Sequence, residues 1–147
     1  MHASAECIAK AARFGLSKSF RGDYSCSSAV LTDDLEAAVE RRLSGLFASA
    51  MRSGNLVIGP RFVAQELQND QIQVVVMARD AGVSICPTLM KAVNEGRVVA
   101  WGTKVQLGAA LGRCDATVVG VRCPSLGTAI AEVCRIADSV RSCSEVR

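Results

Sequence analysis

The sequence predicts an α/β fold, a three-layer α/β/α sandwich with a four-stranded mixed sheet. Two observations lead to this prediction. From about residue 32 onward, short apolar runs of strand length alternate with segments of helical pattern, which is typical of a sheet buried between helices. In addition, 50% of the 147 residues are hydrophobic but only 4% are aromatic, so the core must be built from aliphatic side chains.

Two helices are expected before the first strand. Segment 4–14 has a helix-forming composition and breaks at Gly15, and the polar segment 17–32 then serves as a connector. Thr32 or Asp33 can cap the second helix, with Glu36 as the capping-box partner of Asp33. Gly54 is expected to end this helix. Its apolar stripe, spaced by three and four residues, consists of Leu35, Val39, Leu43, Leu46, Phe47 and Ala50.

The remainder of the chain alternates between strands and helices. Pro60, directly after Gly59, suits the first position of a helix, and Thr103 can cap another. The apolar run 72–78 is nearly continuous, as expected for a strand covered on both faces. Strands are therefore predicted at 55–58, 72–78, 97–101 and 116–121, and helices at 60–69, 87–94, 103–111 and 125–140.

The formal charge of +3 is unevenly distributed. Residues 1–22 contain four basic residues, Lys10, Arg13, Lys18 and Arg21, and one acidic residue, whereas the rest of the chain is balanced. The basic segment is either a phosphate-binding surface or a solvated helix face, and its charges alone do not distinguish the two.

The cysteines indicate reduced thiols and not a metal site. They form no C-x-x-C pair, and the single histidine, His2, lies at the terminus. Cys134 falls on the apolar face of a predicted helix, where a free cysteine packs as a small hydrophobic residue. We therefore expect neither a bound metal nor another cofactor. The seven cysteines are Cys7, Cys26, Cys86, Cys114, Cys123, Cys134 and Cys143.

Membrane insertion and catalysis are not expected. No apolar run approaches the roughly 20 residues that span a bilayer, and the N-terminus lacks a secretory pattern, so the expected location is the cytoplasm. A histidine-based triad would have to use His2, and neither common glycine motif for phosphate binding is present. Asp80 ends a central strand but lacks the paired acidic residues that a phospho-acceptor aspartate needs for Mg²⁺.

The turn from Gly59 into the following helix is the candidate binding site. A helix N-terminus presents unpaired backbone N–H groups and a partial positive charge, and both attract phosphate. Gly59 permits close approach of a backbone, Pro60 begins the helix, and Arg61 adds a guanidinium that can bind phosphate or a guanine edge. These residues favour RNA binding over catalysis.

Three stretches in order along the chain carry a family resemblance: Ser53–Gly59, Gln73–Asp80 and Gln106–Gly112. Together with the elements between them, they resemble the kink-turn-binding ribosomal-protein superfamily, the L-seven-Ae and L-thirty-e group. Within it, the chain looks closest to the bacterial YlxQ-like proteins. The resemblance spans about residues 35–137 and implies a protein that binds structured RNA.

The chain departs from this superfamily at the candidate site. In the superfamily, asparagine and glutamate follow the glycine and one further residue, and a lysine comes three residues later; these side chains contact the sheared purine pairs of a kink-turn. Here Arg61, Phe62 and Gln65 occupy those positions, so the contacts cannot be made in the same way. Phe62 can stack on an unpaired base or pack in the core, and we favour the core.

Three further arginines are candidates for the same site. The resemblance identifies the loop 121–124, with Arg122, as the second contact loop beside the first. Arg52 and Arg79 can line the same rim. For each of the three arginines taken alone we favour a solvated surface charge, but together with the helix N-terminus they form a candidate phosphate-binding surface. The predicted RNA-binding residues are Gly59, Pro60, Arg61, Phe62, Gln65, Arg52, Arg79 and Arg122.

Residues around the predicted helix 103–111 are weaker candidates. Lys104 and Arg113 flank this helix, away from the expected site. Gly108 is expected to permit close packing, and Gly112 to end the helix.

The N-terminal segment carries a second resemblance. Ser4–Phe20 resembles the closing part of a YlxR-type domain, a small basic nucleic-acid-binding module linked to transcription termination. Some proteins join this module to a ribosomal-type domain in the same order. We therefore expect residues 1–31 to be a remnant of the module with a linker, and residues 32–147 to form the RNA-binding domain.

The resulting prediction is a non-enzymatic RNA-binding protein. Its expected partner is structured RNA, either ribosomal RNA or a messenger RNA leader. An association with the ribosome or with transcription termination or antitermination rests on the resemblance alone. The alternative is a protein-interaction module of the same fold that has lost kink-turn recognition, and the missing asparagine and glutamate support it.

Overall fold

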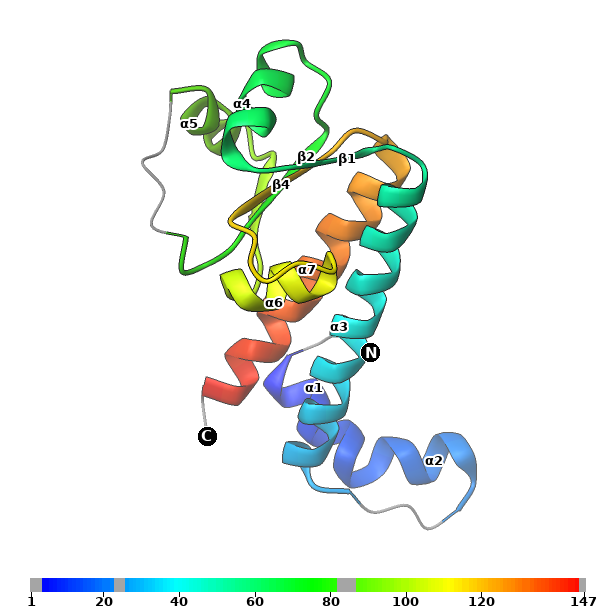
Figure 1. The fold of residues 1–147 in the computed structure, drawn as a ribbon. Coiled ribbons are helices and arrows are strands. Elements are labelled where there is room, and N and C mark those ends of the chain that lie inside the picture. Colours follow the sequence, from blue (N-terminus) through cyan, green and yellow to red (C-terminus); the bar gives the residue numbers. More distant parts are fainter. Residues whose placement is uncertain (1–3, 23–25, 82–86, 146–147) are drawn as a thin grey trace. The chain divides into compact units, whose positions relative to one another are not determined.

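The computed structural model describes residues 4–22, 26–81 and 87–145. The chain forms two compact units, one of residues 1–41 with 135–147 and one of residues 42–134. Two long helices, α3 (Ser28–Arg52) and α7 (Pro124–Glu145), contribute to both units (Figure 1). Among the described residues, no helix combines the length and the apolar composition needed to cross a membrane.

The N-terminal segment of the first unit is helical for longer than predicted. Helix α1 (Ala5–Lys10), the π-helical turn η1 (Ala11–Gly15) and α2 (Leu16–Phe20) follow one another without interruption. The predicted break at Gly15 is wrong, because this glycine has an ordinary helical φ of −67°. The segment ends instead at Arg21, which has a left-handed φ of 51°. Ile8 and Ala12 are its buried side chains.

Helix α3 begins earlier than the capping pattern predicted. The Ser27 hydroxyl oxygen accepts a hydrogen bond from the Val30 backbone N–H at 3.2 Å, as an N-cap does. The predicted cap at Thr32 or Asp33 is therefore wrong. Thr32 lies inside the helix, where its buried hydroxyl donates to the Ser28 carbonyl at 2.7 Å. Such a bond to the preceding turn lets a threonine sit within a helix.

The apolar stripe of α3 and its C-terminal end are confirmed. Leu43, Phe47 and Ala50 are completely buried, as the spacing of three and four residues requires. Gly54 follows the helix with a φ of 70°, and the Asn55 N–H donates to the Ala50 carbonyl at 2.9 Å. A residue with positive φ at this point closes the helix and redirects the chain into the first strand.

The sheet is four-stranded and mixed, as predicted. Its strands are β1 (Leu56–Ile58), β2 (Val74–Met77), β3 (Val98–Ala100) and β4 (Val118–Val121), in the order β1-β4-β2-β3. β4 is antiparallel to both of its neighbours, and β3 is parallel to β2. Consequently β1, β2 and β3 run in one direction and β4 in the other. The connecting helices are α4 (Pro60–Gln68), α5 (Pro87–Asn94) and α6 (Lys104–Ala110).

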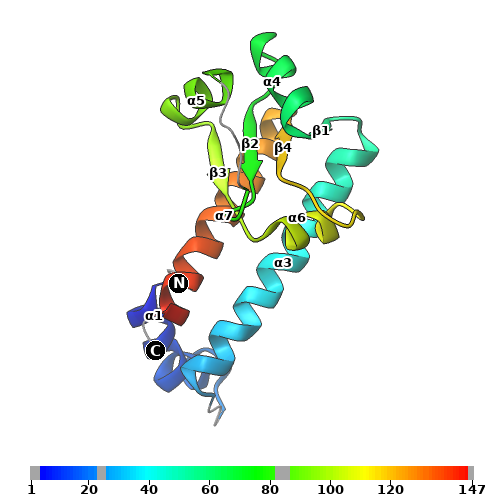
Figure 2. The ribbon, with the colours of Figure 1, turned by 60° about the vertical axis from the view of Figure 1, so that its left-hand side comes forward.

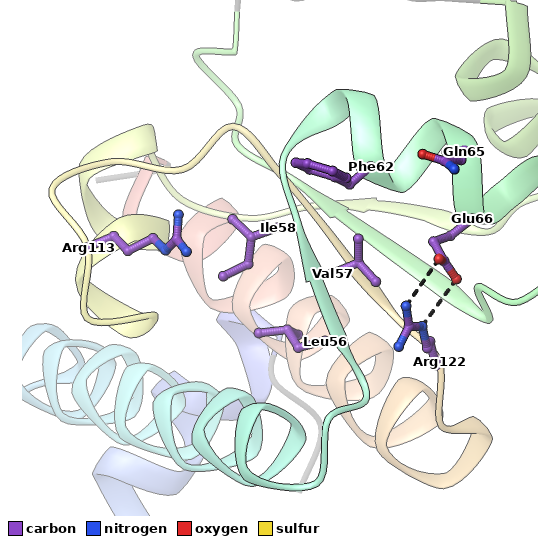
Figure 3. A pocket seen from close by; sticks show the side chains of 8 residues that line it. All are labelled: Leu56, Val57, Ile58, Phe62, Gln65, Glu66, Arg113 and Arg122. Carbon is purple, nitrogen blue, oxygen red and sulfur yellow. Dashed lines mark hydrogen bonds and ion pairs between the residues drawn. The ribbon is translucent and has the colours of Figure 1, made fainter.

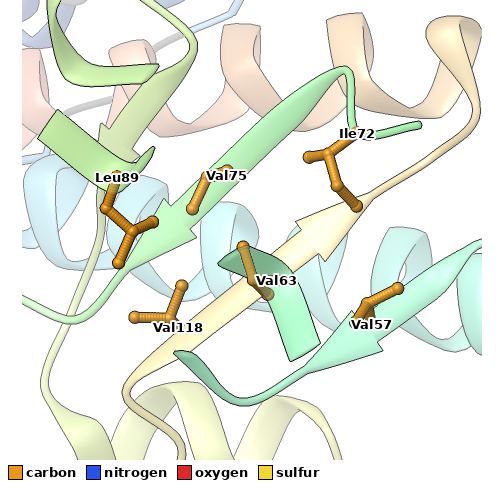
Figure 4. Packing of buried hydrophobic residues seen from close by; sticks show 6 residues of the cluster. All are labelled: Val57, Val63, Ile72, Val75, Leu89 and Val118. Carbon is orange, nitrogen blue, oxygen red and sulfur yellow. The ribbon is translucent and has the colours of Figure 1, made fainter. Parts of the chain in front are cut away.

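Helices cover both faces of the sheet in the unit 42–134, which gives the predicted three layers (Figures 1 and 2). Val63 of α4 and Leu89 of α5 pack against one face, in the cluster drawn in Figure 4. On the opposite face Gly127 of α7 lies so close to β2 that an added Cβ would be 3.3 Å from Val74 Cγ2. The cluster in Figure 4 consists of Val57, Val63, Ile72, Val75, Leu89 and Val118.

Candidate nucleic-acid interface

The N-terminus of α4 has no side-chain cap. Gly59, its N-cap, has a φ of 105° and ψ of 143°, a conformation that side-chain-bearing residues rarely adopt. The Gly59 N–H donates to the Val118 carbonyl at 2.9 Å, and Pro60 has no N–H. No side chain caps the helix, so the N–H groups of Arg61 and Phe62 point out of its first turn without a partner in the described chain.

Phe62 is on the surface, and the interpretation that it packs in the core is wrong. Its exposed fraction is 62%, whereas the neighbouring Val63 is completely buried. α4 uses Val63 and the half-buried Leu67, four residues apart, to cover the sheet. Phe62 consequently projects to the side and lies over the turn, with its Cδ2 3.7 Å from where a Cβ of Gly59 would be.

Phe62 borders a groove of about 520 Å³ along β1 (Figure 3). β1 is an edge strand. The Gly59 N–H donates to the Val118 carbonyl and the Arg122 N–H donates to the Asn55 carbonyl, so the odd-numbered residues along β1 make the hydrogen bonds to β4. The backbone groups of Leu56 and Ile58 therefore face the free edge. The residues that line the groove are Leu56, Val57, Ile58, Phe62, Gln65, Glu66, Arg113 and Arg122.

Arg122 lies at the opposite end of β1 from the Gly59 turn, so the two loops are not side by side as expected. Its backbone N–H donates to the Asn55 carbonyl at 2.8 Å, at the start of β1. Its guanidinium is held by the Glu66 carboxylate, with Nε and Nη2 at 3.2 and 3.1 Å, and by the Gly54 carbonyl at 3.2 Å. Arg122 thus lines the groove as one half of an ion pair.

Arg113, a weaker candidate in the sequence, lines the same groove. It belongs to the segment that precedes β4, and β4 begins where Val118 meets Gly59. Figure 3 shows Arg113 and Arg122 on opposite sides of β1. The Arg113 side chain is exposed and forms no ion pair with any residue in the described part of the chain. Arg113 precedes β4, which is antiparallel to β1. Its place in the groove could therefore be predicted only from the directions of these two strands.

Arg52 and Arg79 do not line the groove. Arg52 ends α3, on the side of the sheet where β1 starts. Arg79 follows β2, and its backbone N–H donates to the Gly102 carbonyl at 2.8 Å, at the sheet end that also holds the Gly59 turn. The structure therefore brings Phe62 and Gln65 into one groove with Arg113. Gly59, Pro60 and Arg61 form the uncapped first turn of α4, and they do not line the groove.

Two cysteine thiols differ in their chemistry. Burial raises the pKa of the Cys134 thiol to about 12. The backbone N–H of Leu126 and then the Ser125 hydroxyl, 3.1 Å from Sγ, lower the pKa of the Cys123 thiol, because both stabilise the thiolate. Within the described residues, no cluster of three or more metal-ligating side chains is found. His2, Cys86 and the side chain of Cys143 lie outside the residues described.

These pKa shifts predict unequal alkylation. With iodoacetamide at pH 7.5–8, Cys123 should be modified much faster than Cys134, because the thiolate is the reactive form. The reaction at Cys123 should also persist at lower pH than that of an ordinary thiol. Peptide mapping by mass spectrometry measures both sites at once. In urea, where the protein is unfolded, the two cysteines should react at similar rates. If Cys134 reacted as fast as Cys123 in the folded protein, Cys134 would not be buried.

Comparisons with known proteins support the fold. No family model and no curated protein sequence matches the chain. A protein of unknown function from Bacillus halodurans has a similar structure, with a TM-score of 0.55 and 25% identity, over 64% of this chain and 97% of that one. The 15.5 kD RNA-binding protein of Giardia lamblia is also similar, with a TM-score of 0.52 and 18% identity, over 70% and 90% of the two chains. The chain shares the α/β/α fold of these two proteins.

Proposed function

We propose that the protein is a non-enzymatic RNA-binding protein whose site is the groove along β1 and the N-terminus of α4. The observation that carries this proposal is an uncapped helix N-terminus with Arg61 in its first turn, next to a groove that Arg113 lines. Arg61 and Arg113 are exposed, and neither has an acidic partner in the described chain. Arginine side chains and unpaired N–H groups at a helix N-terminus both suit phosphate.

The fold gives independent support. The Giardia protein of the same fold is described as RNA-binding. Structured RNA, such as ribosomal RNA or a messenger RNA leader, is the proposed partner, and a role at the ribosome or in transcription termination follows from the family resemblance alone. The replacement of the superfamily's asparagine and glutamate by Arg61 and Phe62 argues against kink-turn recognition by the usual contacts.

A protein-interaction role of the same fold is the second candidate. It is favoured by the free edge of β1, where the backbone groups of Leu56 and Ile58 face away from β4. Such an edge can accept an added strand from a peptide. Binding through backbone hydrogen bonds and apolar contacts depends little on salt, whereas phosphate binding releases counterions and weakens steeply as salt rises.

The proposed function predicts RNA binding that depends on salt and on Arg61. A fluorescence titration should compare a kink-turn RNA, a plain hairpin and a single strand at about 50 and 200 mM salt. Arg61→Ala should weaken binding about tenfold and reduce the slope of log affinity against log salt by about 0.7–0.9, because one phosphate contact is lost.

Lys91→Ala is the matched control for this titration. It removes one positive charge from α5, where Lys91 lies 3.9 Å from Glu95 and lines a different cavity. Its affinity and salt slope should equal those of the wild type. If no RNA binds at 50 mM salt, the proposed function is wrong, and a salt-insensitive peptide ligand would then support the second candidate.

A further inference from the structure

We infer that the groove takes an unpaired nucleobase, stacked on Phe62, with the Gln65 amide at the base edge and Arg113 at the adjoining phosphate. The inference rests on the proposed RNA binding and specifies the kind of RNA. Bases in loops, bulges and single strands would bind, whereas those inside a double helix would not. Three properties of the groove support it: an exposed aromatic face, a polar group beside that face, and the distribution of charge.

The aromatic face comes from the first turn of α4. Phe62 exposes 62% of its surface, because Val63 and Leu67 are the residues of α4 that cover the sheet. Exposure of an apolar ring to water is unfavourable, so a ligand that covers the ring would gain free energy. The ring lines the groove together with the side chains of β1 (Figure 3). A planar apolar ring next to a cavity is suited to stacking on another ring, and every nucleobase has such a face.

The polar group is the side-chain amide of Gln65, one turn along α4 from Phe62. Gln65 is exposed and lines the same groove. Its amide can both donate and accept hydrogen bonds, as the edges of all bases require. The apolar side chains Leu56, Val57 and Ile58 complete the lining. The volume of about 520 Å³ lies within the range of sites for small organic ligands.

The charges determine which way the nucleotide lies. Glu66 would repel a phosphate, but its carboxylate is bound to Arg122 by contacts of 3.2 and 3.1 Å. That end of the groove is therefore neutralised. Arg113, beyond the other side of β1, is the groove cation without an ion-pair partner in the described chain (Figure 3). The phosphate accordingly belongs at the Arg113 end and the base edge towards Gln65.

Stacking on Phe62 requires a base face that no other base covers. Within a double helix both faces of each internal base are stacked, and the narrow major groove of A-form RNA excludes side chains. A single strand or a loop can turn one base out towards the protein at lower cost. The groove should therefore select single-stranded over duplex RNA, in contrast to a site that binds paired purines.

The test compares variants of Phe62 on two RNAs. A fluorescein-labelled 12-nucleotide oligouridine and the same strand annealed to its complement are titrated at about 50 mM salt. The wild type should bind the single strand at least tenfold more tightly than the duplex. Phe62→Leu, which keeps the apolar bulk but removes the ring, should weaken single-strand binding about 5- to 150-fold. Phe62→Trp should retain it.

The Phe62→Trp variant also reports stacking directly. Its new indole lies in the groove, and its emission should be quenched by a stacked base on addition of the single strand. Trp101 is only 6% exposed and supplies the background, which should not change in the wild type. Because Phe62 is exposed, all variants should retain the wild-type circular dichroism spectrum.

Two failures can be told apart. If RNA binds but Phe62→Leu has the wild-type affinity, or the duplex binds as well as the single strand, the stacking inference is overturned while the proposed function stands. Absence of quenching in Phe62→Trp under saturating single strand has the same meaning. If neither RNA binds the wild type, the stacking inference is overturned. The proposed function is wrong only if the kink-turn and hairpin RNAs of the earlier titration also fail to bind.

Discussion

Replacing Phe47 by alanine is expected to lower the free energy of unfolding of the unit 42–134 by about 3–5 kcal/mol. Phe47 is completely buried on α3, and its ring centroid lies 6.5 Å from that of Trp101 with the planes tilted by 53°. The substitution removes the apolar surface, leaves a cavity, and breaks an aromatic pair that contributes about 0.5–1.5 kcal/mol of its own. A domain whose total stability is about 5–15 kcal/mol would lose a large share of it.

Phe62→Ala is the matched control, because it makes the same chemical change at a surface position. With 62% of its surface exposed, Phe62 should contribute less than about 0.5 kcal/mol. Urea unfolding followed by the emission of Trp101, the single tryptophan of the chain, measures both variants in the unit that contains them. If Phe47→Ala lowered the free energy of unfolding as little as Phe62→Ala does, Phe47 would not stabilise this core.

The difference between these two phenylalanines shows what the sequence could predict. On α3, six apolar residues at spacings of three and four predict a buried stripe. Five of them are buried in the structure, and Leu35 is half-buried. On the short α4, Phe62 and Val63 are adjacent, and only one of them can face the sheet. The residues four positions on resolve the choice, since Val63 is followed by Leu67 and Phe62 by Glu66. That signal favours an exposed Phe62.

Helix ends were less predictable than helix interiors. Ser27 and Thr32 are both residues that cap helices, and their hydroxyl groups make different bonds in the structure. The acidic residues after Thr32 resemble a first helical turn, but the chain is already helical from Ser28. Composition alone therefore could not place the start of α3 to within a turn.

The membership of the site depended on strand direction, which local patterns do not contain. Alternating strands and helices are compatible with parallel or mixed pairing. Because β4 runs against β1, the residues that precede β4 lie near the Gly59 turn and those that follow it lie at the far end. As a result, Arg113 lines the groove together with Phe62, whereas Arg122 lies at the other end of β1. The Glu66 partner of Arg122 is 56 residues away along the chain, beyond any local pattern.

Replacing Gly108 by alanine is expected to destabilise the fold and to damage the groove together. A Cβ at Gly108 would lie 2.5 Å from the Cα, 2.7 Å from the N and 2.8 Å from the C of Asp115. These are backbone atoms, so no side-chain rotation relieves the contact. α6 and the segment before β4 must separate, at a cost of about 3 kcal/mol. Gly45→Ala in α3 is the control, because no atom beyond the adjacent residues and the neighbouring turns of its own helix backbone lies within 4 Å of its Cβ position.

The two glycine substitutions should change stability in opposite directions. Gly45→Ala should raise the free energy of unfolding by about 0.5–1 kcal/mol, because alanine favours the helix. Gly108→Ala should also weaken single-stranded RNA binding as much as Arg113→Ala does, since the Arg113 N–H donates to the Gly108 carbonyl at 2.8 Å and its segment is the one displaced. Unfolding and RNA titration on the same samples separate the effects. If Gly108→Ala had the stability of the wild type, α6 would not pack directly against the Asp115 backbone. If Gly108→Ala were destabilised but bound RNA with the wild-type affinity, Arg113 would not belong to the site.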